Sequence, residues 1–254
     1  MARPHTPIKK ELSYIYTDDR IPAPELKQLV INEVAGCVFQ NLPEFLDTIF
    51  PVAQLANEIQ TGQDCLWQFL HELVNAGLLE PSQWKKFPDD GCHEIQLLDP
   101  FVEIFNAITK LCGSEDRIKW RDEHSKPPQS ACGELLRPDI LAMLNHPVNS
   151  PVHWHNVLLP VEVKRRNQPQ QALPQLITYA RNLLREQWNR RFTFGFICAG
   201  REFQVWLFDR SGAIGSPTIN FHQVRTSLVA VSTSLMQVFL VYSNPWSSLG
   251  LLQG

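Results

Sequence analysis

Apolar and polar positions follow the periods of strands and helices along most of the chain. Two apolar runs, Ile140–Leu144 and Val157–Lys164, flank a polar connection, and this pattern predicts an antiparallel hairpin. Residues 168–188 carry apolar side chains at helical spacing. Residues 192–198 and 203–208 alternate as two further strands. A helix between the second hairpin strand and the next strand permits a parallel crossover, so we expect an α/β core with a mixed central sheet flanked by helices.

The part before this core reads as helical. After an irregular arm over residues 1–24, helical spacing covers residues 25–48, with an interruption near Pro43. Further helices are predicted at about 52–61 and about 64–78, where Gly77 would end the helix. This segment is acidic and has no chemical motif. We expect residues 1–90 to form an extension that covers the core or contacts a protein partner.

Residues 91–222 are predicted to form the core itself. Pro100 suits the first position of a helix capped by Asp99, and a short strand is expected at Arg117–Trp120. Residues 223–254 form an apolar tail without a charged residue after Arg225. The apolar stretch in it is short and interrupted by polar residues, so we expect a packed segment and no membrane span.

Composition points to an ordinary folded protein inside the cell. The chain has 254 residues, of which 44% are hydrophobic and 19% charged. Its six cysteines are widely spread and form no Cys-x-x-Cys pair, so neither a zinc knuckle nor a redox motif is indicated. The first residues contain no apolar signal region. We therefore expect reduced thiols and a location in the nucleus or cytoplasm.

Charge is distributed unevenly. The net charge is −3, yet residues 161–201 hold eight basic and two acidic side chains, a local charge of +6 that leaves −9 for the remainder. Arg165, Arg166, Arg181 and Arg185 are candidates for contact with a phosphate backbone. The alternative is a solvated helix face, since Arg181 and Arg185 are four residues apart.

The hairpin brings chemistry to one end of the predicted sheet. Glu162 and Lys164 share a strand face because side chains alternate. Asp139 precedes the first strand, so antiparallel pairing puts it near Glu162. Two carboxylates about 4 Å apart repel by roughly 4 kcal/mol at an effective dielectric near 20. A hard cation such as Mg²⁺ reverses that sign, and it can activate water and stabilise a phosphoryl transition state. The plainer interpretation is a hairpin whose charged residues mark the strand ends.

Other residues leave alternatives open. Glu94 and Glu103 are two further acidic residues on or near the helix before the hairpin, and both could be solvent-exposed. His153 and His155 alternate as in some metal-binding strands but lack a third ligand at sensible spacing. The loop that carries them could instead contact substrate.

The order Pro138-Asp139, Glu162-x-Lys164 and Gln175-x-x-x-Tyr179 resembles the PD-(D/E)XK nuclease core, in its RecB-like branch. The resemblance implies a restriction-endonuclease-like fold. It implies Mg²⁺ or Mn²⁺ bound by Asp139, Glu162, the Val163 carbonyl and one more acid before the first core strand, either Glu94 or Glu103. It also implies that Lys164 assists the attacking water. It also implies that Gln175 and Tyr179 support the site or the substrate. Taken alone, the Gln175–Tyr179 pair is also typical of a tyrosine half-buried at a helix edge.

A narrower resemblance covers roughly residues 80–222. Its motifs are similar to the region upstream of the kinase in fungal-type protein kinases and to nuclease-like domains of fungal spore-killer proteins, and they end in Trp206-Leu-Phe-Asp-Arg-Ser-Gly212. The resemblance implies a fungal origin. The chain stops where those proteins continue into a kinase, and it has neither a Gly-rich phosphate loop nor a His-Arg-Asp segment, so we do not expect kinase activity.

Three functions remain at this level. The first is a metal-dependent nuclease that acts on nucleic acid, with DNA favoured over RNA. The second is a nuclease-like module that binds or regulates without turnover. The third is a scaffold for a protein partner, carried by the helical extension. Cleavage polarity, target structure and oligomeric state do not follow from the sequence.

Overall fold

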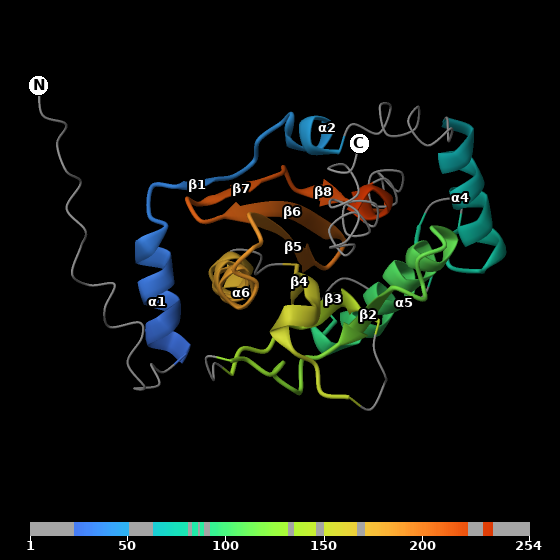
Figure 1. Cartoon of the computed structure of the whole chain (residues 1–254). Coiled ribbons are helices and arrows are strands. Elements are labelled where there is room, and N and C mark those ends of the chain that lie inside the picture. Colours follow the sequence, from blue (N-terminus) through green and yellow to red (C-terminus); the bar gives the residue numbers. More distant parts are fainter. Residues whose placement is uncertain are drawn as a thin grey trace, which may run out of the picture.

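A mixed β-sheet forms the centre of the protein (Figure 1). The computed structural model describes residues 23–50, 63–80, 83–85, 87–88, 92–131, 135–145, 150–166, 171–222 and 231–235. The sheet has eight strands in the order β1-β7-β6-β5-β4-β3-β2, and β8 pairs with β6. The strands are β1 (Val38–Phe39), β2 (Ile118–Asp122), β3 (Ile140–Leu144), β4 (Val157–Lys164), β5 (Phe192–Ala199), β6 (Glu202–Asp209), β7 (Ala213–Gly215) and β8 (Ile219–Asn220). The helices are α1 (Ala23–Glu33), α2 (Phe45–Ile49), α4 (Gln63–Asn75), α5 (Ile95–Leu111) and α6 (Ala172–Glu186), with a 3-10 turn η2 (Trp154–Asn156).

The segment from α5 to β5 builds the part of the sheet that carries the predicted chemistry. Strands β2, β3 and β4 pair antiparallel in sequence order. Helix α6 then crosses the sheet, so that β5 runs parallel to β4. Strand β6 returns antiparallel beside β5. The expected mixed sheet, the hairpin and the parallel crossover are therefore confirmed.

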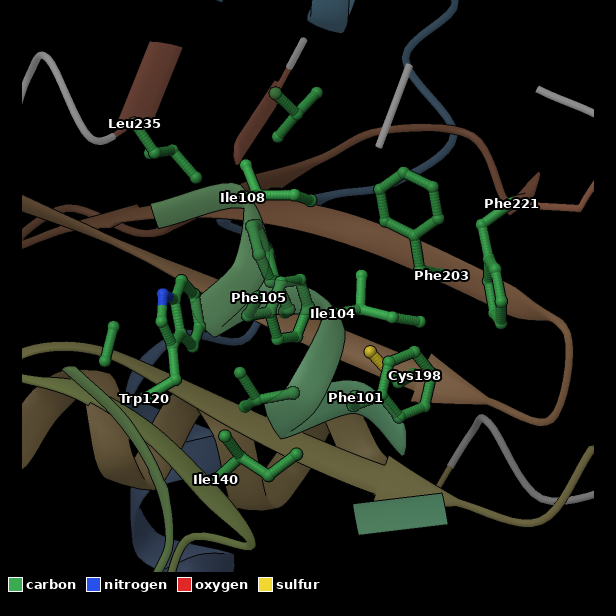
Figure 2. Packing of buried hydrophobic residues seen from close by; sticks show 14 of the residues in the cluster. Phe101, Ile104, Phe105, Ile108, Trp120, Ile140, Cys198, Phe203, Phe221 and Leu235 are labelled. Atoms are coloured by element: carbon green, nitrogen blue, oxygen red, sulfur yellow. The ribbon is translucent and has the colours of Figure 1, made fainter. Parts of the chain in front are cut away.

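Alternating side chains of the strands divide the core between the two faces of the sheet. On β3, Ile140 and Ala142 belong to the apolar cluster packed against α5, whereas Leu141 and Met143 belong to the cluster packed against α6. The α5 cluster is rich in aromatic residues (Figure 2), and the rings of Phe105 and Trp120 stack with centroids 4.3 Å apart. The two helices thus hold the β3–β4 pair from opposite sides.

Strand β2 lies at one edge of the sheet, and a side chain of α5 completes its backbone hydrogen bonds. The Asn106 Nδ2 donates to the Trp120 carbonyl at 2.9 Å, and the Trp120 backbone N–H donates to Asn106 Oδ1 at 3.1 Å. The amide therefore bonds this edge residue as a neighbouring strand would. This contact fixes α5 along the sheet.

The prediction of a helix over residues 25–48 is wrong in its second half. Helix α1 ends at Glu33, and Gly36 turns the chain with φ +83°. Strand β1 follows and pairs in parallel with β7, more than 170 residues further along the chain. The Ala213 backbone N–H donates to the Cys37 carbonyl at 2.9 Å. The pairing of β1 with β7 thus overrides the helical periodicity of this segment. Pairing between distant segments leaves little signal in the local sequence.

Helix α5 begins at Ile95, so the predicted start at Pro100 is also wrong. Its first turn is closed by a 2.9 Å bond from the Leu97 backbone N–H to the Glu94 carbonyl, and the Gln96 side chain accepts the His93 backbone N–H at 2.9 Å. Pro100 is tolerated inside the helix, although its ring removes one backbone donor. The earlier start makes Glu94 the residue that leads into the helix.

Other expectations are confirmed, or lie outside the described residues. Helix α4 ends before Gly77, which has φ +72°. The helix expected at 52–61 lies outside the described residues. In the tail, residues 231–235 are helical, and Val231 and Leu235 are buried in the α5 cluster. No helix in the described ranges is long and apolar enough to cross a membrane. The domain boundaries near 90 and 222 stay predictions.

Candidate active site

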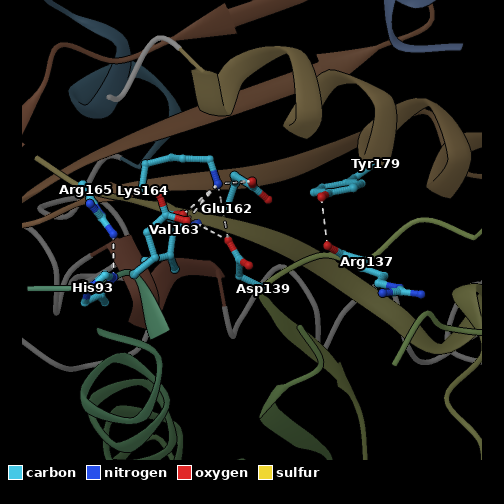
Figure 3. A network of polar contacts seen from close by, with 9 residues as sticks. His93, Arg137, Asp139, Glu162, Val163, Lys164, Arg165 and Tyr179 are labelled. Carbon is cyan, nitrogen blue, oxygen red and sulfur yellow. Dashed lines mark hydrogen bonds and ion pairs between the residues drawn. The ribbon is translucent and has the colours of Figure 1, made fainter. Parts of the chain in front are cut away.

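Asp139, Glu162 and Lys164 meet where β3 begins and β4 ends (Figure 3). Ile140, the first residue of β3, pairs with Val161 near the end of β4. Asp139, which precedes Ile140, therefore lies beside the last residues of β4. Lys164 Nζ is 2.6 Å from Glu162 Oε1 and 4.0 Å from Asp139 Oδ2. The predicted convergence of two carboxylates and one ammonium is therefore what the fold produces.

The backbone of Val163 joins these side chains. Its N–H donates to Asp139 Oδ2 at 2.7 Å, which fixes the position of that carboxylate. Its carbonyl, the predicted metal ligand, accepts a 3.0 Å hydrogen bond from Lys164 Nζ. A backbone carbonyl and three side chains thus face one small volume.

Of the two candidate upstream acids, only Glu94 joins this cluster. Its Oε2 lies 3.7 Å from Lys164 Nζ. Glu103 lies more than two turns further along α5 and is exposed. Glu94 reaches the cluster because α5 begins at Ile95, which brings the residue before the helix to the end of β4. The roles of both acids stay predictions.

Glu162 is the most strongly perturbed acid of the cluster. Its side chain is 1% exposed. Burial raises the pKa of Glu162 to about 8, with a further contribution from the negative charge of Asp139 and with opposition from Lys164. A proton on this group at neutral pH is thus the result of desolvation beside a like charge.

The pKa values of Asp139 and Lys164 are also raised. Burial raises the pKa of Asp139, while the Val163 hydrogen bond and Lys164 oppose that rise. For Lys164, burial lowers the pKa, but the carboxylates of Glu162, Asp139 and Glu94 together raise it above its usual value. Lys164 therefore remains charged. Three acids around one ammonium give a net charge of −2 when all are ionised, which one divalent cation would balance.

The Gln175–Tyr179 pair on α6 lies at the end of the sheet that carries Asp139 and Glu162. The Tyr179 hydroxyl donates to the Arg137 carbonyl at 2.9 Å and so holds the segment that leads to Asp139. Burial raises the pKa of Tyr179, and the nearby charge of Glu162 adds to the rise. A hydrogen bond from the Gln175 side chain acts in the opposite direction. The pair therefore contacts the site from the α6 side, as a support for the Asp139 segment.

The four candidate arginines separate into two groups. Arg165 and Arg166 directly follow β4 and are exposed beside the cluster. Arg181 and Arg185 are further along α6 and contact the protein itself, Arg181 through Glu33 at 3.3 Å and Arg185 through the Asn182 side chain at 2.7 Å. The first two are thus the arginines next to the cluster, and nucleic-acid binding by any of the four stays a prediction.

The donor set suits a hard cation, although its present arrangement is closed around Lys164. Among the described residues, no three His, Cys, Asp or Glu side chains are grouped as a metal site. Instead, Lys164 Nζ lies between the oxygens of Glu94, Asp139, Glu162 and Val163. Glu162 Oε2 is buried and has no hydrogen bond of ordinary geometry, although the Tyr179 hydroxyl lies near enough to lower the pKa of this carboxyl. A buried carboxylate oxygen without a partner is costly, and a cation is one way to satisfy it.

Two histidines near the site were not predicted from the sequence. His124 follows β2, and its Nδ1 contacts Asp122 Oδ1, which orients the ring. The charge of His124 lowers the pKa of Asp139, though less than other neighbours do. His93 precedes α5, and its Nδ1 contacts Arg165 Nη2 (Figure 3). Only the Asp-x-His spacing of the first pair was visible as a local signal.

The Trp206–Gly212 motif supports the fold and contributes no group to the site. Asp209 accepts the backbone N–H groups of Ser211 and Gly212 at 2.8 and 2.9 Å. Arg210 donates to the carbonyls of Leu184 and Trp188 at the end of α6. The motif therefore closes the β6–β7 turn and caps α6.

Comparison with known proteins points to one family. A model of the fungal protein kinase family matches residues 137–240, somewhat under half of the chain. The match begins at the Asp139 segment and includes Glu162, Lys164, Gln175 and Tyr179, while Glu94 precedes it. A comparison with curated proteins finds no match. Over residues 137–240 the chain is thus similar to the fungal protein kinase family.

Proposed function

We propose that this protein is a nuclease that uses Mg²⁺ or Mn²⁺ to hydrolyse phosphodiester bonds of nucleic acid. The observation that carries the proposal is the cluster of Glu94, Asp139 and Glu162 around Lys164 at the open end of β4. The α5-β2-β3-β4-α6-β5 order, with the acids at the ends of β3 and β4, supports assignment of the core to the PD-(D/E)XK nuclease fold.

The metal would be held by oxygen donors of this cluster. Asp139, Glu162 and the Val163 carbonyl are the proposed ligands, and Glu94 is the fourth because Glu103 lies apart from them. Oxygen ligands of this kind are those that Mg²⁺ prefers. When bound, such a cation supplies Lewis-acid activation of water and stabilises negative charge on the phosphoryl group.

Lys164 is proposed to act on the attacking water. In the structure its ammonium bonds Glu162 and the Val163 carbonyl. With a cation on those oxygens, Lys164 can turn its protons toward water or toward the charge that develops on the phosphate. Tyr179 acts through another group: it bonds the Arg137 carbonyl and so positions Asp139.

The substrate is proposed to be nucleic acid, with DNA favoured. Exposed Arg165 and Arg166 extend directly from the strand that carries Glu162 and Lys164. Cations in this place can neutralise phosphates next to the reacting one. Because the whole chain has a net charge of −3, contact is expected to be local to this end of the sheet.

A second candidate is a silent nuclease-like module that binds or regulates. The similarity of residues 137–240 to the fungal protein kinase family is compatible with such a module, because that similarity does not indicate a nuclease. The short Lys164–Glu162 ion pair at 2.6 Å is also compatible with a site that is permanently closed by its own lysine.

The deciding experiment is hydrolysis of labelled single- and double-stranded DNA and RNA with Mg²⁺ or Mn²⁺. Asp139→Asn, Glu162→Gln and Lys164→Met should each lower kcat by at least about a hundredfold, in the range for loss of a transition-state contact. Glu103→Gln is the matched control on α5 and should cleave at the parent rate.

The outcomes separate the two candidates. Cleavage that needs a divalent cation and fails in the three site variants would support the nuclease and identify its substrate. A folded parent that cleaves none of the four substrates would contradict it and leave the silent module. Cleavage that survives all three substitutions would show that the activity belongs to a contaminant.

A further inference from the structure

A depression of about 460 Å³ adjoins the carboxylate cluster. It is lined by His93, Glu94, Ile95 and Arg165. Glu94 belongs to the cluster itself, His93 and Ile95 flank Glu94 in the chain, and Arg165 follows Lys164. A group bound in the depression would therefore lie next to a group that reacts at Lys164.

The two nitrogen-bearing side chains of the depression are paired. Arg165 Nη2 contacts His93 Nδ1, as Figure 3 shows. A guanidinium has only donors, so the Nδ1 of His93 accepts in this contact. His93 therefore holds one edge of the guanidinium and leaves the other N–H groups of Arg165 available to a ligand.

The lining fits a nucleotide phosphate with its sugar or base. Arginine donors match the oxygens of a phosphate in charge and geometry. Ile95 is 59% exposed and offers an apolar surface beside them. Glu94 is the one acidic group in the lining, and its Oε2 is 3.7 Å from Lys164 Nζ, so its charge is directed to the cluster.

We propose that this depression binds the phosphate that neighbours the scissile phosphate, with Arg165 as its charge partner and His93 as the residue that positions Arg165. The inference rests on the proposed nuclease function and adds a defined subsite to it. It also separates Arg165 from Arg166, which is exposed next to it but does not line the depression.

The test removes one phosphate charge at a time. A labelled oligonucleotide with a mapped cleavage site is prepared with a single methylphosphonate directly before, directly after, or far from the scissile phosphate. For the parent, one of the two neighbouring substitutions should lower kcat/KM about tenfold to a hundredfold, the range for a charged hydrogen bond. The distant substitution should have little effect.

Variants assign the contact to the depression. Arg165→Met should lower kcat/KM on the unmodified substrate and should no longer respond to that methylphosphonate. His93→Phe, which keeps an aromatic ring but removes the acceptor, should show a reduced response, mainly in KM. Arg166→Met is the comparison variant: because Arg166 does not line the depression, this variant should lower kcat/KM on the unmodified substrate but keep the full response to that methylphosphonate.

Failure of the subsite differs from failure of the nuclease. If the parent cleaves but Arg165→Met responds to every methylphosphonate as the parent does, the subsite is refuted and the nuclease stands. The same holds if Arg166→Met, and not Arg165→Met, loses the response. If the parent does not cleave at all, both proposals fall.

Discussion

The Glu162 carboxylate is buried beside Asp139, and this placement ties the stability of the fold to pH. The folded protein keeps a proton on Glu162 up to about pH 8, whereas an unfolded chain loses it near pH 4.5. The folded state therefore binds more protons between these values, and the free energy of unfolding should fall as the pH rises through this range. Asp139, whose pKa is also raised, adds to the same trend.

We predict that Glu162→Gln flattens this dependence. Because the amide cannot ionise, the variant should be more stable than the parent at pH 8 by a few kcal/mol, and the difference should shrink toward pH 5. Urea unfolding at a series of pH values in the presence of a chelator measures it. A parent whose stability rises from pH 5 to pH 8, or a variant with the same slope, would contradict the assignment.

Two glycines test how tightly the sheet is packed, one in the β6–β7 turn and one on β5, where it faces α6. A Cβ at Gly212 would lie 2.1 Å from the Cys37 carbonyl oxygen, which belongs to the backbone. A Cβ at Gly195 would meet the end of the Leu176 side chain at 2.9 Å. Gly212→Ala should therefore cost about 3 kcal/mol and Gly195→Ala about 1 kcal/mol, since a side chain yields more easily than a backbone.

Thermal or urea unfolding of both variants measures the difference. Both glycines have ordinary φ angles, so conformational freedom does not separate them. A Gly212→Ala protein as stable as Gly195→Ala would mean that β1 is free to move away from β7.

Single residues of the site could be predicted where the strand pattern fixes them. Alternation along β4 puts Glu162 and Lys164 on one face, and antiparallel pairing brings Asp139 beside them. His93 could not be found in this way, because its partner Arg165 is 72 residues away in sequence. The sequence could not decide between Glu94 and Glu103, because the answer depends on where α5 begins. Pro100 led to a predicted helix start five residues too late.

At the scale of elements, α1 lies against the α6 side of the core. Val30 is 1% exposed and belongs to the cluster that contains Leu176 and Tyr179. Its neighbour Leu29 is 53% exposed. The helix thus covers α6 through one face.

Substitutions on α1 test this packing. Val30→Ala should cost about 2 kcal/mol of unfolding free energy, from the lost transfer energy and a small cavity. Leu29→Ala is the control and should change stability by less than about 0.5 kcal/mol. Urea denaturation of the two variants decides it, and equal effects would show that α1 does not dock as described.

Elements with strong local periods were predictable, and those made by distant pairing were not. The α6 helix and strands β3 to β6 follow their apolar patterns closely. Strand β1 has two residues and depends on β7, so the local helical spacing prevailed in the prediction. The expected helix start at Pro100 failed because proline favours a first turn but does not require one.

At the scale of the whole molecule, the sheet and its two helical layers hold like charges together against their repulsion. Helix α5 brings Glu94, β3 and β4 bring the two buried acids, and α6 holds the segment before Asp139 through Tyr179. A ligand that binds only the folded protein stabilises it by mass action. The repulsion between these acids lowers the stability of the folded protein, and a divalent cation bound at the cluster should raise it again.

Calorimetric titration of the metal-free protein with Mn²⁺ at pH 8 measures the proposed metal site itself. We predict one site in the parent, lost or weakened at least about tenfold in Asp139→Asn and Glu162→Gln, and unchanged in Glu103→Gln. Removal of one ligating oxygen from a small set is expected to have an effect of this size. A folded parent that binds no Mn²⁺, or binding that persists in both site variants, would contradict the account.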